Sequence, residues 1–311
     1  MLPDWWEPDC EKDGSLLPDL EIRLARFLQV PLADIQGHKA KLVAPAYPNA
    51  RLRRVAKLED DQLGPSIHAG LSIAAATLRS LRAPLPAVAT PPTDASIWHQ
   101  ELSSTNRPLL EAGTADLWRR GIPVIHVELM PSPRFQGLAC IVQGRPVVLI
   151  GHDVDVPARL FSHLAHEVGH IVAGDCAEDA PVVDESDEAT DRSTMERLAD
   201  KYAIASALGE SPPDLVSGAI RTDFKRLAQH AAGVGRERGL DVGSLIWSWT
   251  TKTKEFAVGV QALKAAYRHL GGARTIRAQL DEFVDTSSAS ESDRALLRCV
   301  KGDPDRHAAP G

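Results

Sequence analysis

The feature that most constrains this chain is the HExxH run His166-Glu167-Val168-Gly169-His170. On an α-helix, residues four apart lie on one face, so the imidazoles of His166 and His170 can reach a single metal ion. Glu167 directly follows the first histidine, which brings its carboxylate close to any metal-bound water. The run therefore predicts a helix with a zinc site, and it favours a hydrolase, with a peptidase as the main expectation.

The residues around this run predict that its helix is buried. The helix is expected to begin after Asp155, because Pro157 suits a first turn, and to end at Gly174. Apolar side chains cover much of its circumference: Leu160, Leu164, Val168, Ile171 and Val172. Imidazoles buried in such surroundings without partners would be costly to desolvate. A metal ion would satisfy them, which favours a ligand role over simple packing.

A zinc peptidase needs a third protein ligand and an open position for water. The best candidate is Glu196, which lies 26 residues after His170. The pattern Ser193-Thr-Met-Glu196 resembles a capping box, so it predicts a helix that opens there and runs to about Leu208. That helix could pack beside the first. Helix capping is the alternative role of Glu196. Other candidate ligands stay open: Cys176 and the loop acids Asp184, Glu185, Asp187 and Glu188.

Peptide hydrolysis also needs a group that stabilises the developing oxyanion. His163, Tyr202 and His230 are candidates, and the sequence does not rank them. His163 lies one turn before His166 on the same helical face, so it could instead support the metal ligands from outside. Ordinary burial is the alternative role of His163, and ordinary packing is that of Tyr202.

Periodicity along the chain predicts an α+β fold with mostly helical ends. A strand is expected over 122–129. A hairpin should follow, with strands 137–142 and 145–150 around a Gln143-Gly144 turn, next to the HExxH helix. We expect these strands to form a small antiparallel or mixed sheet.

Composition divides the chain into five expected regions. The stretch 83–95 carries four prolines and is predicted to be a linker. It separates a mostly helical region, 1–82, from a metallopeptidase core, 96–210. A helical region, 211–300, and a disordered tail, 301–311, are expected to follow.

Charge and cysteine content limit the setting of the protein. The net charge of −7 argues against a whole-surface affinity for nucleic acid. Residues 39–57 nevertheless hold six Lys or Arg and no acidic residue, which predicts a basic loop or arm, either solvated or in contact with nucleic acid. The four cysteines form no CxxC pair, and the sequence shows no export signal and no membrane-length apolar run. We therefore expect a cytoplasmic protein without membrane contact.

Two blocks of this sequence resemble the ImmA/IrrE-type metallo-endopeptidases. The block 159–170 is similar to their active helix, and Glu196-Arg-Leu-Ala-Asp-Lys-Tyr-Ala203 is similar to their E-x-x-A-(N/D)-x-F-A signature, with Tyr202 at the usual Phe. The likeness covers about residues 107–208. It implies a zincin-like fold, with a small sheet beside the active helix. It also implies zinc ligation by His166, His170 and Glu196, and Glu167 as the general base. Manganese is the alternative metal, and the sequence does not decide between the two.

The resemblance also implies a partner. Members of this family cleave XRE-type helix-turn-helix repressors, often during stress or the induction of mobile elements. Residues 18–35 resemble the last helix of an XRE domain, but the earlier helices of such a domain are absent. The C-terminal third resembles no family.

Two other functions stay open at this point. One is a DNA-binding transcription regulator whose zinc site is structural or sensory. The other is a partner-binding component of a two-gene regulatory or toxin–antitoxin pair, with slow or absent catalysis.

Overall fold

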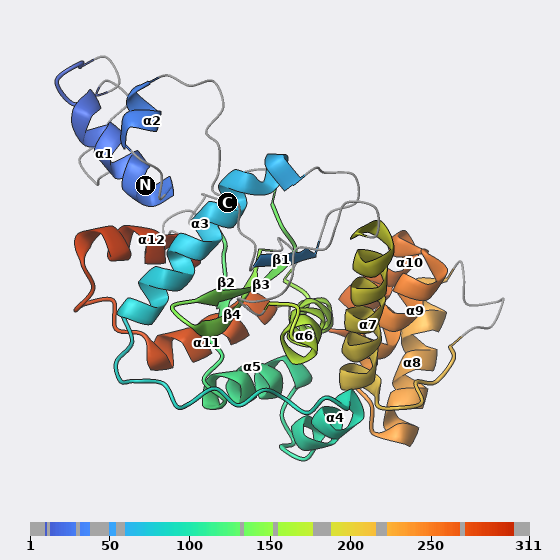
Figure 1. The fold of residues 1–311 in the computed structure, drawn as a ribbon. Coiled ribbons are helices and arrows are strands. Elements are labelled where there is room, and N and C mark those ends of the chain that lie inside the picture. The colour runs from blue at the N-terminus through green and yellow to red at the C-terminus, as the bar shows by residue number, and fades with distance from the viewer. Residues whose placement is uncertain are drawn as a thin grey trace, which may run out of the picture.

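The computed structural model shows a small mixed sheet enclosed by helices (Figure 1). It describes residues 10, 13–28, 32–37, 50–53, 60–130, 134–151, 155–176, 188–215, 223–267 and 271–301. The predicted α+β class is confirmed. None of the helices within these ranges combines the length and the apolar character needed to cross a membrane.

The sheet has the strand order β1-β3-β4-β2. Its strands are β1 (Ala50–Arg53), β2 (Val124–His126), β3 (Gly137–Val142) and β4 (Arg145–Ile150). The predicted hairpin of β3 and β4 is confirmed with its boundaries. Gln143 and Gly144 both have positive φ, 54° and 72°, as a two-residue hairpin turn requires.

The two outer strands complete a mixed sheet. β2 runs parallel to β4, and its pairing begins at Val148. Pro146 precedes this pairing, which explains why an interior strand tolerates a residue without an amide donor. On the other edge, β1 runs antiparallel to β3. β1 lies within the basic stretch 39–57, where the sequence predicted a loop or arm, so this strand was missed.

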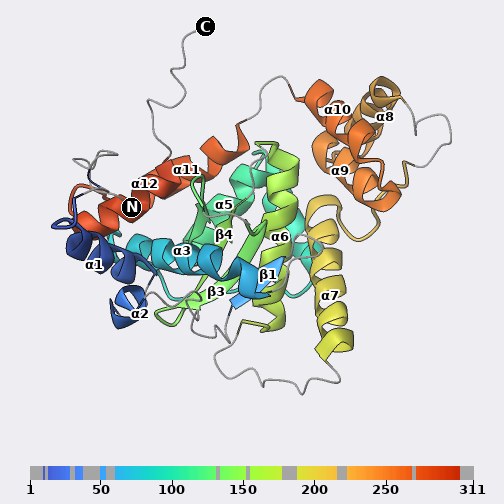
Figure 2. The same ribbon diagram turned by 90° about the horizontal axis from the view of Figure 1, so that it is seen from above.

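Alternating side chains of the sheet supply two hydrophobic cores. In β4, Val148 and Ile150 join the core shared with the HExxH helix. Val147 and Leu149 join a second core on the opposite face. This second core is shared by α3 (Asp60–Arg79) and α12 (Glu291–Lys301), which also pack against each other. Figure 2 shows both helices on the side of the sheet away from the HExxH helix.

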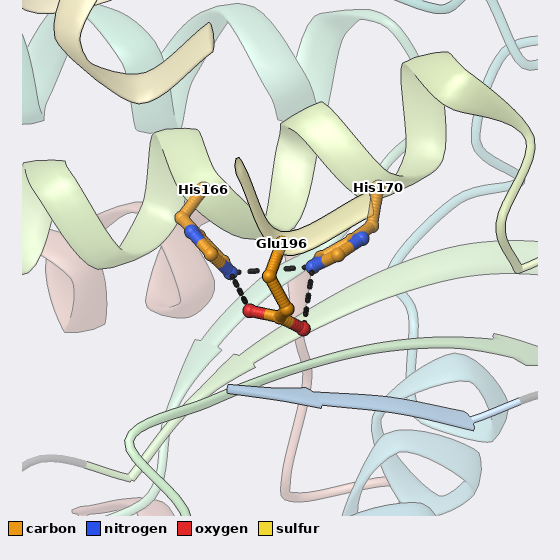
Figure 3. A group of neighbouring side chains, drawn as sticks. All are labelled: His166, His170 and Glu196. Carbon is orange, nitrogen blue, oxygen red and sulfur yellow. Dashed lines mark hydrogen bonds and ion pairs between the residues drawn. The ribbon is translucent and has the colours of Figure 1, made fainter. Parts of the chain in front are cut away.

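The HExxH helix is α6 (Pro157–Ala173), and it begins and ends as predicted. Pro157 occupies its first turn, and Gly174 terminates it with a left-handed φ of 79°. Its main neighbour is α7 (Glu188–Leu208), which lies alongside it. Side chains from both helices meet between them (Figure 3). The prediction that α7 opens at Ser193 was wrong, because the helix begins at Glu188 and Glu196 lies about two turns inside it.

The remaining helices surround this arrangement. At the N-terminal side, α1 contacts α3, and α4 packs on α7. Towards the C-terminus, three helices pack together, and one of them, α9, also contacts α6 and α7. The bounds are α1 (Leu17–Leu28), α2 (Leu32–Gln36), α4 (Ala95–Ser103), α5 (Leu109–Arg119), α8 (Phe224–Arg238), α9 (Val242–Thr253), α10 (Phe256–Ala266) and α11 (Gly272–Phe283). Residues 302–311, the greater part of the predicted tail, lie outside the described residues.

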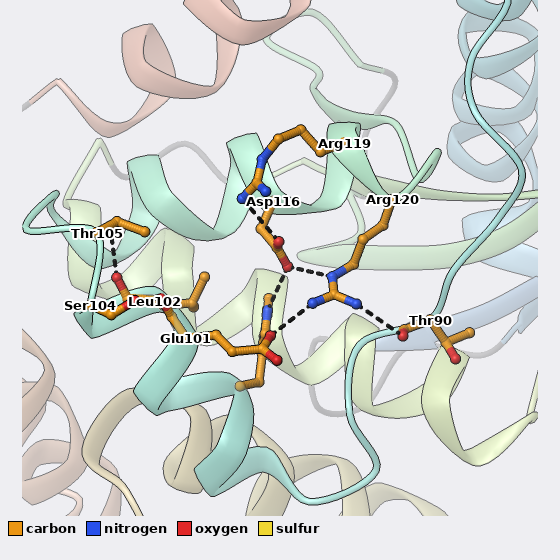
Figure 4. A network of polar contacts seen from close by, with 9 residues as sticks. Thr90, Glu101, Leu102, Ser104, Thr105, Asp116, Arg119 and Arg120 are labelled. Atoms are coloured by element: carbon orange, nitrogen blue, oxygen red, sulfur yellow. Dashed lines mark hydrogen bonds and ion pairs between the residues drawn. The ribbon is translucent and has the colours of Figure 1, made fainter.

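The proline-rich stretch 83–95 is tied to the helices beside it. Arg120, at the end of α5, accepts a backbone hydrogen bond from Ala89 and donates to the Thr90 carbonyl (Figure 4). Ile73 of α3 and Leu138 of β3, from either side of this stretch, belong to the same core. The division into five regions stays a prediction.

The side chain of Asp116 joins this network to the core. Its carboxylate accepts hydrogen bonds from the buried Trp98 indole at 2.9 Å and from Arg120 Nε at 2.6 Å. Arg120 also pairs with Glu101 at 2.8 Å. One buried carboxylate thus holds α4, α5 and the 83–95 stretch together.

Replacing this carboxylate should destabilise the fold. Asp116→Ala leaves the Trp98 indole N–H buried without an acceptor, so we expect a loss of about 2–4 kcal/mol in the free energy of unfolding. Urea unfolding measures it. The control is Glu111→Ala, which removes an exposed 3.8 Å ion pair with Arg107 and should cost less than about 1 kcal/mol. Equal losses in the two variants would contradict the role of Asp116.

Candidate metal centre

Three side chains from α6 and α7 converge on one point. His166 and His170 are each 1% exposed, and the Glu196 side chain is 38% exposed. One ligand atom from each lies within 4.8 Å of the others. Figure 3 shows both imidazoles directed at the two oxygens of the Glu196 carboxylate. The structure therefore brings together the two histidines and the third ligand that the sequence favoured.

The distances fit a site that encloses a small cation. His166 Nε2 lies 3.3 Å from Glu196 Oε2, and His170 Nε2 lies 3.6 Å from Glu196 Oε1. The two Nε2 atoms are 3.2 Å apart, and the ring planes differ by 76°. Each carboxylate oxygen thus faces a different imidazole, and the three groups point inward from two helices.

A glycine allows the two helices to approach closely enough. A Cβ atom at Gly169 would lie 3.0 Å from the Cα of Ala199 and 3.2 Å from the Cβ of Tyr202. A side chain at this position of the HExxH run would therefore require α7 to move by a few tenths of an ångström. Because Glu196 sits on α7, the glycine controls how near its carboxylate comes to the histidines.

Two aspartates hold the histidines from the opposite side. Asp200 Oδ1 lies 2.9 Å from His166 Nδ1, and Asp175 Oδ2 lies 2.7 Å from His170 Nδ1. An ionised carboxylate only accepts hydrogen bonds, so each Nδ1 carries the proton. The neutral tautomer then leaves the lone pair of each Nε2 facing the centre. Such carboxylate–histidine pairs fix ring orientation and raise ligand basicity in metal sites.

Sequence reasoning assigned no role to either aspartate. Asp200 lies one helical turn after Glu196, inside the second sequence block. Asp175 follows the helix-ending Gly174, and its amide donates to the carbonyl of His170. The sequence did offer a signal for Asp175. The chain reverses at the glycine that ends the HExxH helix, so a carboxylate just after this glycine is turned back toward the second histidine.

The charges of these groups also favour a cation. Burial raises the pKa of the Glu196 carboxyl, but the neighbouring imidazoles, His166 first and His170 second, outweigh it and hold the pKa below its usual value. Glu196 is therefore ionised at neutral pH. Two Nε2 lone pairs at 3.2 Å repel each other unless a cation or proton lies between them. Two imidazoles and one carboxylate are the ligand set of many zinc hydrolases.

Glu167 lies against the sheet and is not one of the group of three. It is 0% exposed and lies against Gly137 at the start of β3, where a Cβ atom would be 2.8 Å from its carboxyl carbon. The glycine thus provides the space that the Glu167 side chain occupies. Its predicted role as a general base stays a prediction.

The other predicted residues have different surroundings. His163 is buried on α6, one turn before His166. Tyr202 donates a 2.9 Å hydrogen bond to the Pro92 carbonyl, and its ring lies 6.1 Å from that of Trp98. These are the contacts of a side chain that packs between α4 and the 83–95 stretch. Burial raises the pKa of its phenol, so it stays protonated. His230 is exposed on α8.

The alternative ligands do not replace Glu196 in the described part of the chain. Cys176 is buried and forms no disulfide, and it is not part of the His166, His170 and Glu196 group. Asp184, Glu185 and Asp187 lie outside the described residues, as does the side chain of Glu188.

Comparisons with known proteins identify no family for this chain. Neither a protein-family model, nor a curated protein, nor a solved structure matches it. The likeness to the ImmA/IrrE-type peptidases therefore rests on the two sequence blocks. The geometry of His166, His170 and Glu196 is an independent observation, which supports a zincin-like site without naming a family.

The two aspartates should strengthen metal binding without contacting the metal. Asp175→Ala and Asp200→Ala each release one imidazole from its fixed orientation, so we expect zinc affinity to fall by about 10- to 100-fold. Competition with a fluorescent zinc chelator measures it. The control is Asp214→Ala, which removes an exposed aspartate paired with Lys252 and should leave the affinity unchanged. Wild-type affinity in both site variants would rule out the proposed support.

Proposed function

We propose that this protein is a zinc-dependent endopeptidase of the ImmA/IrrE type that cleaves a helix-turn-helix transcriptional repressor. The observation that supports it best is the inward orientation of three ligand groups. Both Nε2 atoms and the Glu196 carboxylate face one point, while each Nδ1 is bonded to an aspartate. Buried histidines need a partner for the ring N–H in any case, but packing alone does not require both Nε2 atoms and a carboxylate to face one point.

His166, His170 and Glu196 would hold the metal. Imidazole nitrogens with one carboxylate suit zinc better than they suit magnesium or calcium, which prefer oxygen ligands, and manganese is the alternative. When bound, zinc supplies a Lewis acid and lowers the pKa of a coordinated water to about 7. Three protein ligands leave room for that water, as a catalytic site requires.

The other steps belong to side chains of this chain. Glu167 takes a proton from the attacking water and later gives it to the leaving amine. Its position next to His166 in the sequence keeps it near the ligands, and its burial against Gly137 strengthens electrostatic interactions by excluding water. Asp175 and Asp200 keep the two imidazoles in the productive tautomer throughout.

The proposed substrate class comes from the resemblance and from charge. The family resemblance implies XRE-type repressors as substrates. The net charge of −7 disfavours direct binding to DNA and suits a protein that acts on a DNA-binding protein instead. Repressors of this kind carry basic surfaces, which complement an acidic enzyme.

Incubating the zinc-loaded protein with helix-turn-helix repressors encoded near its gene tests the proposal. We expect specific cleavage that a chelator abolishes and added zinc restores. Glu167→Gln keeps the size of the side chain but removes the base, so cleavage should fall by at least about 100-fold while zinc stays bound. Mass spectrometry identifies the products, and atomic emission measures the metal.

The same experiment separates the other two functions. An intact repressor that co-purifies with the zinc-loaded protein would indicate a non-catalytic binding partner. A shift of operator DNA by the protein alone at physiological salt would indicate a regulator. Undiminished cleavage by Glu167→Gln would exclude Glu167 as the base.

A further inference from the structure

The edge of β3 beside α6 is occupied by a strand from far upstream in the chain. β1 pairs with it antiparallel, with Ala50 opposite Cys140 and Arg53 opposite Gly137. β3 therefore lies between β4 and β1, and β1 forms the edge of the sheet. A connection of more than 80 residues separates the two paired strands, so β1 is held there by its own local contacts rather than by a tight turn.

This strand runs next to the candidate metal centre. α6 contacts both β1 and β3. Gly137, the register partner of Arg53, is the residue against which the Glu167 carboxylate lies. In Figure 3, β1 is the blue strand on the side toward which the Glu196 carboxylate points. The end of β1 thus lies about one strand spacing from the backbone that contacts Glu167.

An extended substrate would need the same backbone positions. A peptide cleaved at this site must present its backbone in extended form near Glu167, and the adjacent edge of β3 offers N–H and C=O groups for pairing. Peptides commonly dock on enzymes and domains by adding a strand to an exposed edge. With β1 in place, the β3 groups that face it are already paired, and a substrate strand cannot use them.

Charge favours a basic strand at this position. The stretch 39–57, which contains β1, has six Lys or Arg and no acidic residue. The adjacent centre carries the carboxylates of Glu167, Asp175, Glu196 and Asp200. A strand of four residues makes few hydrogen bonds, so it can be displaced more easily than a long one.

We propose that β1 is a self-inhibitory strand, which occupies the edge of β3 and must leave before an extended substrate segment can dock antiparallel beside the metal centre. The inference rests on the proposed function, since it concerns the regulation of the same site. A permanent edge strand would instead protect the sheet and leave the access of substrate to the site unchanged.

The chain itself offers a way to lock this strand. Because Ala50 is opposite the native Cys140, Ala50→Cys creates a cross-strand pair whose Cα separation suits a disulfide. Diamide oxidises the two thiols, which lose two protons and two electrons and form one S–S bond. Burial raises the pKa of Cys140, so the oxidation is run at alkaline pH, and mass spectrometry of the digested protein verifies the bond. The matched control is Ala50→Cys combined with Cys140→Ala.

Locking and releasing β1 should change activity in opposite directions. With fluorescein-labelled casein as the probe, we expect the oxidised Ala50→Cys protein to lose at least about 10-fold in rate and to regain it on reduction, with unchanged zinc content. The control should not respond to diamide. Arg51→Pro with Leu52→Pro removes two successive amide donors of β1, one of which faces β3, and should raise the rate. Equal rates in the locked, reduced and proline-substituted proteins would overturn the proposal.

A binding measurement tests the self-inhibitory role of β1 independently of catalysis. A fluorescein-labelled peptide of residues 46–57 is titrated into zinc-loaded full-length protein, and anisotropy reports binding. We expect the double proline variant to bind it at least about 10-fold more tightly than the locked protein. Equal affinities, or cleavage of the protein's own chain at β1, would overturn the self-inhibitory role. If no variant cleaves casein or a repressor but the peptide affinities differ as expected, the proposed function fails and the exchangeable strand stands.

Discussion

The close contact of α6 with α7 at Gly169 is the constraint on which the candidate site depends. A Cβ atom at residue 169 would lie 3.0 Å from the Cα of Ala199, so the two helices are in direct contact at this glycine. Only this approach lets Glu196, from one helix, face two histidines from the other. A site made by two helices in rigid contact holds its ligands better than one completed by a loop.

The sequence predicted those features that local chemistry determines. Pro157 and Gly174 marked the ends of α6, and the Gln143-Gly144 turn fixed the hairpin, because these residues act through their own backbone preferences. The start of α7 was wrong because the capping-box pattern is also compatible with the middle of a helix. β1 was missed because Ala50–Arg53 shows no apolar run of its own, and its pairing with β3 is a tertiary contact.

The two sides of the centre are built differently. On the side of α6 and α7, Asp175 and Asp200 hydrogen-bond to the two histidines. These hydrogen bonds would keep both neutral imidazoles oriented before a metal ion binds. On the side of the sheet, Glu167 lies against Gly137, whose strand is covered by β1. The candidate ligands are thus preorganised, whereas under the proposed self-inhibition access to Glu167 depends on a short strand. Strong metal binding and low basal cleavage are compatible in such an arrangement.

X-ray absorption spectroscopy at the zinc edge, on the zinc-loaded protein, tests the central claim most directly. The account predicts one zinc per chain, bound by two imidazole nitrogens and by oxygens of Glu196 and water at about 2.0–2.2 Å. In Glu196→Gln, the affinity should fall and the oxygen shell should change. A sulfur ligand at about 2.3 Å, as Cys176 would supply, or a spectrum unaltered by Glu196→Gln would contradict it.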